Sequence, residues 1–280
     1  MSAKINLLAK NKTLSCRGRL LLLDRPRVMG ILNLTPDSFF DGGKFNSVES
    51  ALKRAEQMLE EGADILDLGA YSSRPGADDI SEEEELKRML SALEAIVSRF
   101  PDALISIDTF RSGVATKAME VGAHIINDIS GGNLDADLPL VAARFRAPYI
   151  CMHMRGTPQT MQDGLVQTRL IASLQEFFAQ RVPALVKQGV HDVIIDPGFG
   201  FGKTLEQNYQ LVDRLSDLSI FGKPILVGVS RKSMIRLRYG DSEAQTLKGT
   251  MEVNRLLIQN GADIIRVHDV KEALEVVTNP

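Results

Sequence analysis

The amino-acid sequence predicts an α/β protein, a (β/α)8 TIM barrel preceded by an N-terminal β-hairpin. Short runs rich in Val, Ile and Leu recur eight times along the 280 residues, and amphipathic stretches with helical spacing lie between them. Most of these runs are near-continuously apolar, which is typical of parallel strands covered by helices. The alternative is a doubly wound open sheet, but no predicted strand is followed by the Gly-x-Gly-x-x-Gly turn of that fold.

The first predicted element is a hairpin over residues 13–24, TLSCRGRLLLLD, which we expect to cover the bottom of the barrel. The eight predicted strands that follow are residues 27–34, 63–69, 103–108, 124–129, 148–154, 192–198, 224–230 and 262–269. Because no linker or low-complexity segment interrupts this series, we expect residues 1–280 to form a single domain.

The predicted helices alternate with these strands. They cover residues 48–62, 81–100, 111–121, 135–145, 167–189, 204–219, 242–260 and a short segment after residue 270. Ser81 and the Glu-rich turn after it suit a helix N-terminus, because a hydroxyl caps free amides and acidic side chains complement the helix dipole. Similar sequence segments connect three predicted helices to the strands that follow them, and in each segment Gly ends the helix. The segments are EEGADILDLG, EVGAHIIND and QNGADIIRV.

Composition narrows the classes of partner and the location. The net charge is −3, so no basic bias indicates a nucleic-acid partner. No window approaches ~18 consecutive apolar residues, so we expect no membrane-spanning helix. Cys16 and Cys151 lie far apart and do not form a disulfide framework, so reduced thiols and a cytoplasmic location are expected.

Polar residues interrupt the apolar runs near the carboxyl ends of the predicted strands. They are Asn33, Asp67, Asp108, Asn127, His153, Asp196, Arg266 and His268. A single residue of this kind often caps a helix or fixes a loop. Burial of the whole set is unfavourable unless the members bind each other or a ligand, and the carboxyl ends form the active face of such barrels.

The polar set divides into two halves by its chemistry. Carboxylates, an amide and a lysine suited to a flat heterocycle with amide-like and amino edges are Asp108, Asn127, Asp196 and Lys232. Donors suited to a phosphate-like anion are Asn33, Arg74, Arg266 and His268. Asn33 alternatively offers an oxygen to Mg²⁺, which takes few protein ligands beside phosphate oxygens and water.

Two motifs leave alternatives open, and two classes of site are disfavoured. His153 in CMHM is equally consistent with a core position and with ligand contact. The sequence GFGFGKT, residues 198–204, lacks the spacing of a phosphate-binding loop and is interpreted as a tight turn that presents Phe199 or Phe201 to a ligand. The four histidines lack zinc-ligand spacing, and no serine is recognisably paired with a base.

Eight motifs, taken in order, resemble the dihydropteroate synthase family. They are MGILNLTPDSFFDGG, SSRPGA, ISIDTF, INDISGG, CMHMRGTPQTMQ, IIDPGFGFGK, VGVSRKSMI and RVHDV. The resemblance runs from Val28 to Val270. It implies a (β/α)8 barrel, usually a homodimer, that condenses 6-hydroxymethyl-7,8-dihydropterin diphosphate with 4-aminobenzoate. The products are 7,8-dihydropteroate and diphosphate, in a step of folate biosynthesis that sulfonamides inhibit.

The resemblance also implies roles for single residues. The pterin is expected at Asp108, Asn127, Asp196 and Lys232. Diphosphate is expected at Asn33, Ser73, Arg74, Arg266 and His268, with Mg²⁺ as cofactor on Asn33. The aminobenzoate is expected at Phe39, Arg74, Pro75, Phe201, Lys232 and Ser233. The residues expected to carry catalysis are Asp108, Lys232, Arg266 and His268, through a dissociative, SN1-like path.

One motif departs from the family pattern. The family's second-loop motif reads Gly-Gly-Glu-Ser-Thr-Arg-Pro-Gly, whereas this chain has Ala70, Tyr71 and Ser73 at the second, third and fifth positions. This change bears on loop motion and inhibitor contacts rather than on the reaction. No residues are inserted between Pro36 and Gly43, so sulfonamide sensitivity is expected. The rival functions are a pterin-binding methyltransferase and a non-catalytic pterin-binding protein.

Overall fold

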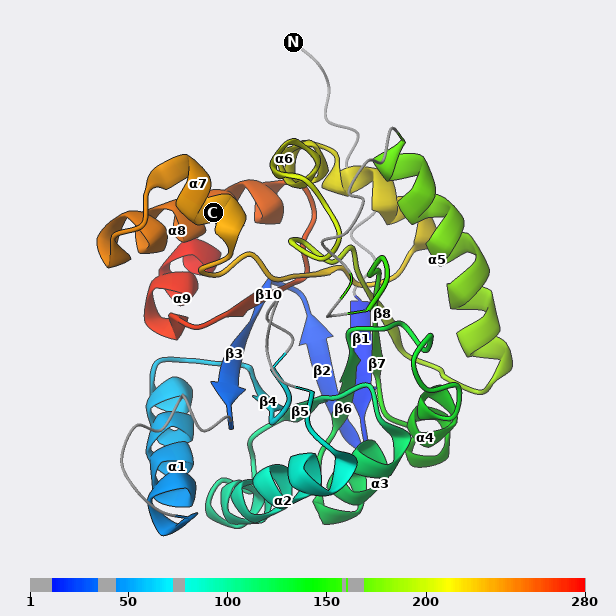
Figure 1. Cartoon of the computed structure of the whole chain (residues 1–280), viewed down its shortest axis with the longest axis vertical. Coiled ribbons are helices and arrows are strands. Elements are labelled where there is room, and N and C mark those ends of the chain that lie inside the picture. The colour runs from blue at the N-terminus through cyan, green and yellow to red at the C-terminus, as the bar shows by residue number, and fades with distance from the viewer. Residues whose placement is uncertain (1–11, 35–43, 73–78, 158–159, 161–168, 280) are drawn as a thin grey trace.

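The computed structural model is a barrel of parallel strands surrounded by helices (Figure 1). It describes residues 12–34, 44–72, 79–157, 160 and 169–279, with the backbone alone for residues 44–47. The predicted α/β barrel with an N-terminal hairpin is confirmed. Within the described ranges, no helix combines the length and apolar character needed to cross a membrane.

Eight parallel strands form the barrel in the order β8-β7-β6-β5-β4-β3-β10-β9. They are β3 (Arg27–Asn33), β4 (Ile65–Gly69), β5 (Ile105–Asp108), β6 (Ile125–Asp128), β7 (Tyr149–Met152), β8 (Val193–Asp196), β9 (Leu226–Val227) and β10 (Ile264–Val267). The Ile195–Ile225 bridge closes the ring, and the amide of Ile195 donates to the carbonyl of Pro224 over 2.9 Å. The strand predicted at 224–230 is therefore much shorter than expected, because only its first part pairs.

The helices follow the predicted alternation. They are α1 (Lys44–Glu60), α2 (Glu82–Arg99), α3 (Ser112–Val121), α4 (Leu138–Phe145), α5 (Leu170–Lys187), α6 (Leu205–Asp213), α7 (Ser233–Tyr239), α8 (Glu243–Gln259) and α9 (Val270–Thr278). The segment predicted as one helix at 204–219 divides into α6 and a 3₁₀ helix, Leu215–Phe221. The short helix α7 was not predicted.

The predicted helix boundaries have a visible physical cause. The Oγ of Ser81 accepts the amide of Glu84 over 3.2 Å, which confirms the predicted cap of α2. Gly62, Gly122 and Gly261 end three helices with φ values of 96°, 136° and 99°. These left-handed φ values favour glycine. The glycine of each repeated Gly-Ala pair therefore ends its helix, as the sequence predicts.

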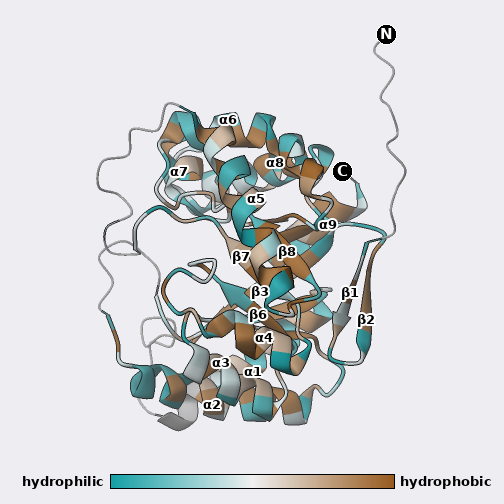
Figure 2. Ribbon diagram, turned by 90° about the vertical axis from the view of Figure 1, so that its right-hand side faces the viewer, coloured by the Kyte–Doolittle hydropathy of each residue, from teal (hydrophilic) through white to brown (hydrophobic). Residues whose placement is uncertain are grey.

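The hairpin covers the amino-terminal end of the barrel, as expected. Strands β1 (Lys12–Cys16) and β2 (Arg19–Leu23) pair antiparallel and lie beside the barrel in Figure 2. Apolar side chains from the hairpin and from the lower barrel form one buried cluster: Leu14, Cys16, Leu21, Leu23, Met29, Ile65, Ile125, Ile150, Ile194, Leu226 and Ile264. Several of these are the first residues of their strands, which identifies the covered end as the amino-terminal one.

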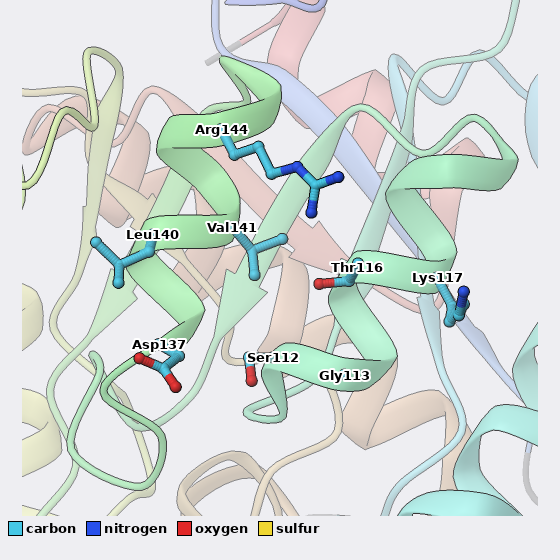
Figure 3. Close-up of a pocket in the computed structure, with 8 residues that line it drawn as sticks. All are labelled: Ser112, Gly113, Thr116, Lys117, Asp137, Leu140, Val141 and Arg144. Atoms are coloured by element: carbon cyan, nitrogen blue, oxygen red, sulfur yellow. The ribbon is translucent and has the colours of Figure 1, made fainter.

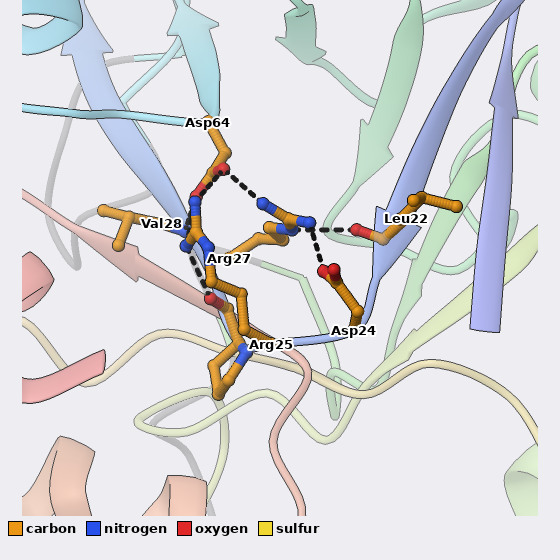
Figure 4. A network of polar contacts seen from close by, with 7 residues as sticks. Leu22, Asp24, Arg25, Arg27, Val28 and Asp64 are labelled. Atoms are coloured by element: carbon orange, nitrogen blue, oxygen red, sulfur yellow. Dashed lines mark hydrogen bonds and ion pairs between the residues drawn. The ribbon is translucent and has the colours of Figure 1, made fainter. Parts of the chain in front are cut away.

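A polar network holds the exit of the hairpin against the barrel (Figure 4). Asp64, just before β4, accepts Arg25 over 2.8 Å, Arg27 over 3.0 Å and the amide of Val28 over 2.9 Å. Arg27 also donates to Asp24 over 2.5 Å. These contacts stabilise the closed bottom, and the opposite end is left for a ligand.

Candidate active site at the carboxyl ends of the strands

The strand-end polar residues point into the barrel because strand side chains alternate between two faces. Ile65, Ile125, Ile194 and Ile264 belong to the inner cluster at the bottom. The residues two positions further along the same strands therefore also face inward. They are Asp67, Asn127, Asp196 and Arg266. The predicted polar set is thus carried by several different strands around one axis.

Arg266 joins the two chemical halves of the predicted site. Its Nε donates to Asp67 Oδ2 over 2.6 Å, and a terminal nitrogen donates to Asp108 Oδ2 over 2.7 Å. Burial opposes the charged guanidinium, but the two carboxylates outweigh it and raise the pKa of Arg266. The residue predicted for the anion is therefore paired with one predicted for the heterocycle.

Asp108 is a buried carboxylate whose charge depends on this contact. Burial raises the pKa of Asp108 to about 7, against the opposing effect of the Arg266 guanidinium. The charge of Asp67 raises it further. Arg266 thus favours the ionised form of Asp108, which accepts hydrogen bonds from a ligand with amino groups.

Asp67 is a functional candidate to which the sequence analysis gave no role. It is fully buried, and its Oδ2 also accepts Asn127 Nδ2 over 3.1 Å. This contact assigns the amide orientation of Asn127 and turns its oxygen to the other side. Among the described residues, Asp67 Oδ1 has no hydrogen-bond partner. The signal for Asp67 was its place in the polar set, in the middle of an apolar strand.

Asp196 and Lys232 form the opposite side of the site. Asp196 is buried and accepts the amide of Gly198 over 2.7 Å. Burial raises the pKa of Asp196, and the nearby ammonium of Lys232 opposes this shift. Burial lowers the pKa of Lys232 to about 8, with Asp196 opposing. The two side chains therefore favour each other's charged forms.

Lys232 is held by the loop that follows β8. Its Nζ donates to the carbonyl of Phe199 over 2.6 Å and lies 4.5 Å from the centre of the Phe201 ring. Phe201 packs against the buried cluster of Ile129, Met152 and Met154. The side chain of Phe199 is fully buried in the outer core. Of the two alternatives from GFGFGKT, Phe201 lies beside Lys232, whereas Phe199 lies in the core.

His268 follows β10 and is oriented by a residue that the sequence analysis left without a role. Ser230 Oγ and His268 Nδ1 are 3.0 Å apart, and the amide of His268 donates to the same Oγ over 3.2 Å. Arg54 of α1 donates to the carbonyl of His268 over 2.6 Å. These bonds fix the imidazole at the carboxyl end of the barrel.

The remaining predicted residues differ in how far the structure describes them. Asn33 is the last residue of β3 and is half-buried, and Ser233 is the exposed first residue of α7. Four predicted residues lie outside the described ranges: Phe39, Ser73, Arg74 and Pro75. In the described part of the chain, no three His, Cys, Asp or Glu side chains are grouped to hold a metal. A lone amide oxygen at Asn33 fits Mg²⁺ bound mainly through phosphate oxygens.

His153 occupies a core position, which is one of the two alternatives that the sequence leaves open. It is 6% exposed, its ring packs edge-on against Phe177 at 5.1 Å, and its Nδ1 lies 3.2 Å from Lys203 Nζ. Burial, with Lys203 beside it, lowers the pKa of His153 to about 3. The imidazole is therefore neutral, and Nδ1 accepts the hydrogen bond from the lysine.

Tyr71, where the chain departs from the family motif, packs at the base of the second loop. Its ring meets Phe110 edge-on at 4.9 Å, and the guanidinium of Arg111 lies 5.4 Å from its centre. Its hydroxyl donates to Asp79 over 3.2 Å. A carboxylate at this position is thus replaced by an aromatic ring that joins the two ends of the loop.

A separate surface pocket lies between two outer helices (Figure 3). Its lining comes from α3, from Asp137 just before α4 and from α4 itself: Ser112, Gly113, Thr116, Lys117, Asp137, Leu140, Val141 and Arg144. None of these is a predicted site residue, and the pocket belongs to the helical layer rather than to the strand ends.

Comparisons with known proteins identify the family of this chain. The family described as pterin binding enzyme matches residues 29–268. Dihydropteroate synthase of Escherichia coli K12 is 43% identical over 270 residues, which cover 94% of each chain. The chain belongs to the dihydropteroate synthase family. The synthase of Synechocystis is 44% identical over 255 residues, covering 90% of this chain and 88% of that one.

Solved structures of the family share the fold. Dihydropteroate synthase of Yersinia pestis, in a sulfonamide complex, is 42% identical with a TM-score of 0.88, covering 96% of this chain and 97% of that one. The Xanthomonas albilineans synthase with 4-aminobenzoic acid is 39% identical with a TM-score of 0.89, covering 95% and 96%. The predicted family, its enzyme class and its place in folate biosynthesis are confirmed.

Proposed function

We propose that the polar residues at the carboxyl ends of the strands bind 6-hydroxymethyl-7,8-dihydropterin diphosphate and direct its condensation with 4-aminobenzoate. The observation that carries the proposal is the contact of Arg266 with Asp108. It joins a carboxylate suited to the pterin with a cation suited to the diphosphate, at 2.7 Å. The two parts of one substrate therefore have adjacent partners.

The pterin half uses charged and amide groups on opposite sides of the barrel. Asp108 and Asp196 accept hydrogen bonds from the amino-substituted edge of the ring, and Asn127 presents its oxygen because Asp67 holds its nitrogen. Lys232 donates to a ring carbonyl or nitrogen. Its place between Phe201 and Asp196 supports this role.

The diphosphate half uses donors from other strands and loops. Arg266, His268 and Asn33 bind the leaving group, with Ser73 and Arg74 of the second loop. Asn33 would hold Mg²⁺, which supplies charge stabilisation to the departing diphosphate when it is bound. The metal role rests on the amide at the strand end and on the resemblance.

The reaction follows a dissociative path. The bond between the pterin CH₂ and the diphosphate oxygen breaks with its electron pair on diphosphate, and Arg266 and His268 stabilise the growing negative charge. The electron-rich pterin delocalises the CH₂ cation. The neutral amine of 4-aminobenzoate then forms the C–N bond and loses a proton. Positioning of the amine replaces a covalent nucleophile.

The aminobenzoate has a mixed apolar and polar environment. Phe201 offers a ring face, while Lys232 and Ser233 offer donors near its carboxylate. Phe39, Arg74 and Pro75 complete the proposed pocket from loops outside the described residues. We extend to this chain the sulfonamide binding seen in the Yersinia pestis synthase, so a sulfonamide competes with 4-aminobenzoate.

The decisive experiment measures diphosphate release from the pterin diphosphate with Mg²⁺, with and without 4-aminobenzoate. Release coupled to dihydropteroate formation is the expected result, and a chelator stops it. Pterin binding without release would favour a non-catalytic pterin-binding protein. Methyl transfer from methyltetrahydrofolate to a corrinoid would favour the methyltransferase.

Three further properties belong to the same proposal. A homodimer is proposed from the resemblance, and the exposed Leu237 of α7 and Leu256 of α8 give it apolar surface to bury. Light scattering at several concentrations checks the dimer, and a monomer throughout would contradict it. A single domain over residues 1–280 and a cytoplasmic location stay predictions.

A further inference from the structure

Lys203 is a buried lysine to which neither the sequence motifs nor the proposed reaction gives a role. It ends the turn GFGFGK between β8 and α6 and is only 4% exposed. Its side chain turns back under its own loop. An isolated buried ammonium is unfavourable by several kcal/mol, so its contacts must compensate for lost water.

The ammonium has three donors, and four acceptors surround it. The carbonyl of Gly198 lies at 2.8 Å, the carbonyl of Phe201 at 3.0 Å and His153 Nδ1 at 3.2 Å. The carbonyl of His153 lies at 3.4 Å. Burial lowers the pKa of Lys203 to about 7, and the charge of Asp196 opposes this shift. Lys203 therefore joins both halves of its own turn to the end of β7.

The backbone of the turn brings these carbonyls together. Gly198, Gly200 and Gly202 have φ values of 70°, 78° and 65°, which favour glycine. A Cβ on Gly198 would lie 2.1 Å from the carbonyl oxygen of His153, so the turn passes directly against β7. The three glycines allow the tight path, and the lysine satisfies the carbonyls that it turns inward.

The same turn holds two residues of the proposed pterin pocket. The carbonyl of Phe199 accepts Lys232 Nζ over 2.6 Å, and the amide of Gly198 donates to Asp196 over 2.7 Å. A Cβ on Gly200 would lie 3.2 Å from Lys232 Cδ. A shift of the turn would thus move the side chain of Lys232 and break the hydrogen bond that holds the carboxylate of Asp196.

We propose that Lys203 is a positioning residue for the pterin: its ammonium clamps the turn 198–203 to the end of β7 and thereby sets Lys232 and Asp196. The inference rests on the proposed function of that pocket. A 1 Å displacement of a binding group is enough to lower activity by as much as ~100-fold, so loss of the clamp is measurable.

The test replaces Lys203 by Met, which keeps most of the side-chain length and removes the donors. In Lys203→Met we expect the binding of 6-hydroxymethyl-7,8-dihydropterin, measured as Kd by calorimetry, to weaken about tenfold or more. The KM for the pterin diphosphate rises with this Kd, and the KM for 4-aminobenzoate rises as well, because Phe201 of this turn and Lys232 also line the proposed aminobenzoate pocket. The matched control is Leu21→Ala, which destabilises the far end of the barrel and leaves both constants unchanged.

A double-mutant cycle separates positioning from stability. In the background of Lys232→Met, Lys203→Met should raise the pterin Kd by less than about threefold, because one of the two residues it sets is already absent. Equal fold-changes in both backgrounds would overturn the inference. So would a Lys203→Met protein that loses thermal stability but binds the pterin within about twofold of wild type.

The calorimetric Kd values distinguish a failure of the proposed pterin pocket from a failure of the role of Lys203. If Lys203→Met does not fold, Lys203→Gln replaces it, because the shorter, uncharged amide cannot reach all of the acceptors around Lys203 Nζ at once, and an unchanged pterin Kd in that variant would overturn the inference. Calorimetry needs no turnover, so the wild type serves to test the proposed function itself. Wild-type protein that binds no pterin would refute the pocket, whereas a wild type that binds while the variants match it would refute only the role of Lys203.

Discussion

At the scale of single residues, Asp67 shows how a side chain away from the ligand can organise the site. One of its oxygens accepts both Arg266 and Asn127, over 2.6 and 3.1 Å. The guanidinium and the amide therefore share one fixed point at the centre of the barrel. The guanidinium also donates to Asp108 over 2.7 Å, so Asp67 is linked through Arg266 to a carboxylate proposed for the pterin.

The substitution Asp67→Ala tests this arrangement. Arg266 keeps one carboxylate partner and the amide of Asn127 loses its fixed orientation, so the pterin Kd should rise about tenfold or more, or about 1.4 kcal/mol. Ser106→Ala is the matched control. Ser106 pairs with Asp67 in register and is equally buried, and its Oγ has no partner among the described residues. Equal effects of the two changes on calorimetric Kd would contradict the role of Asp67.

The charge of Asp108 gives a prediction on pH. Its folded-state pKa is raised to about 7, so between about pH 4 and 7 the folded protein binds more protons than the unfolded chain at this site. The contribution of Asp108 to stability is present at low pH and is lost as pH rises through this window. Arg266→Met removes an opposing charge, so the loss should extend to higher pH.

Urea unfolding at several pH values from 4 to 9 measures this effect. Asp108→Asn provides the control, because an amide has no proton to lose and this part of the pH dependence should vanish. Identical pH profiles for wild type and Arg266→Met would show that the guanidinium does not set the charge of Asp108.

At the scale of elements, the loop after β6 depends on one buried carboxylate. Asp128 accepts the amides of Ser130 over 2.7 Å and Gly132 over 2.5 Å, and the hydroxyl of Tyr149 donates to it. Gly132 has a φ of 81°, which favours glycine. The motif INDISGG therefore combines Asn127, proposed for the pterin, with the anchor that shapes the loop following it.

Removal of this anchor should be more damaging than removal of one of its partners. Asp128→Ala leaves three buried donors without an acceptor, at about 1–3 kcal/mol each, so the free energy of unfolding should fall by at least ~3 kcal/mol. Tyr149→Phe removes a single donor and should lower it by about 1 kcal/mol. Denaturant unfolding compares the two, and equal losses would mean that the loop amides do not depend on Asp128.

The elements themselves were largely predictable because their signals are local. Apolar runs, amphipathic spacing and Gly-Ala handovers identified eight strands and eight helices. The length of β9, which has two residues, was overestimated. Its sequence is as apolar as that of the other strands, and its pairing depends on closure of the barrel. The seven-residue α7 is too short to display a helical period.

The polar site was predictable in membership but not in its contacts. Strand-end position placed Asp108 and Arg266 in the set, yet they lie 158 residues apart and their pairing exists only in the closed barrel. Asp67, Ser230 and Lys203 act on other protein groups, so the chemistry expected of a ligand contact did not reveal them. The sequence left Phe199 and Phe201 as alternatives because aromatic residues in one turn can face either the core or the site.

At the scale of the whole molecule, residues that stabilise the fold and residues of the proposed active site lie at opposite ends of the barrel. The hairpin covers the amino-terminal end through Leu14, Leu21 and Leu23, whereas the proposed chemistry lies at the carboxyl end. The four consecutive leucines of β2 show no alternation of apolar and polar residues, so the sequence does not indicate which leucines are buried. In the structure Leu21 is 8% exposed and Leu20 is 66% exposed, so register alone decides which leucines are buried.

This separation gives a matched pair of substitutions on one strand. Leu21→Ala opens a cavity between the hairpin and the barrel and should lower the free energy of unfolding by about 2–4 kcal/mol. Leu20→Ala changes an exposed side chain and should stay within about 0.5 kcal/mol. Both variants should keep the wild-type kcat and both KM values at temperatures where they are folded, because the lower core is separated from the pterin pocket by packed side chains. A Leu21→Ala protein that is fully folded but has a changed pterin KM would show that the two ends of the barrel are coupled.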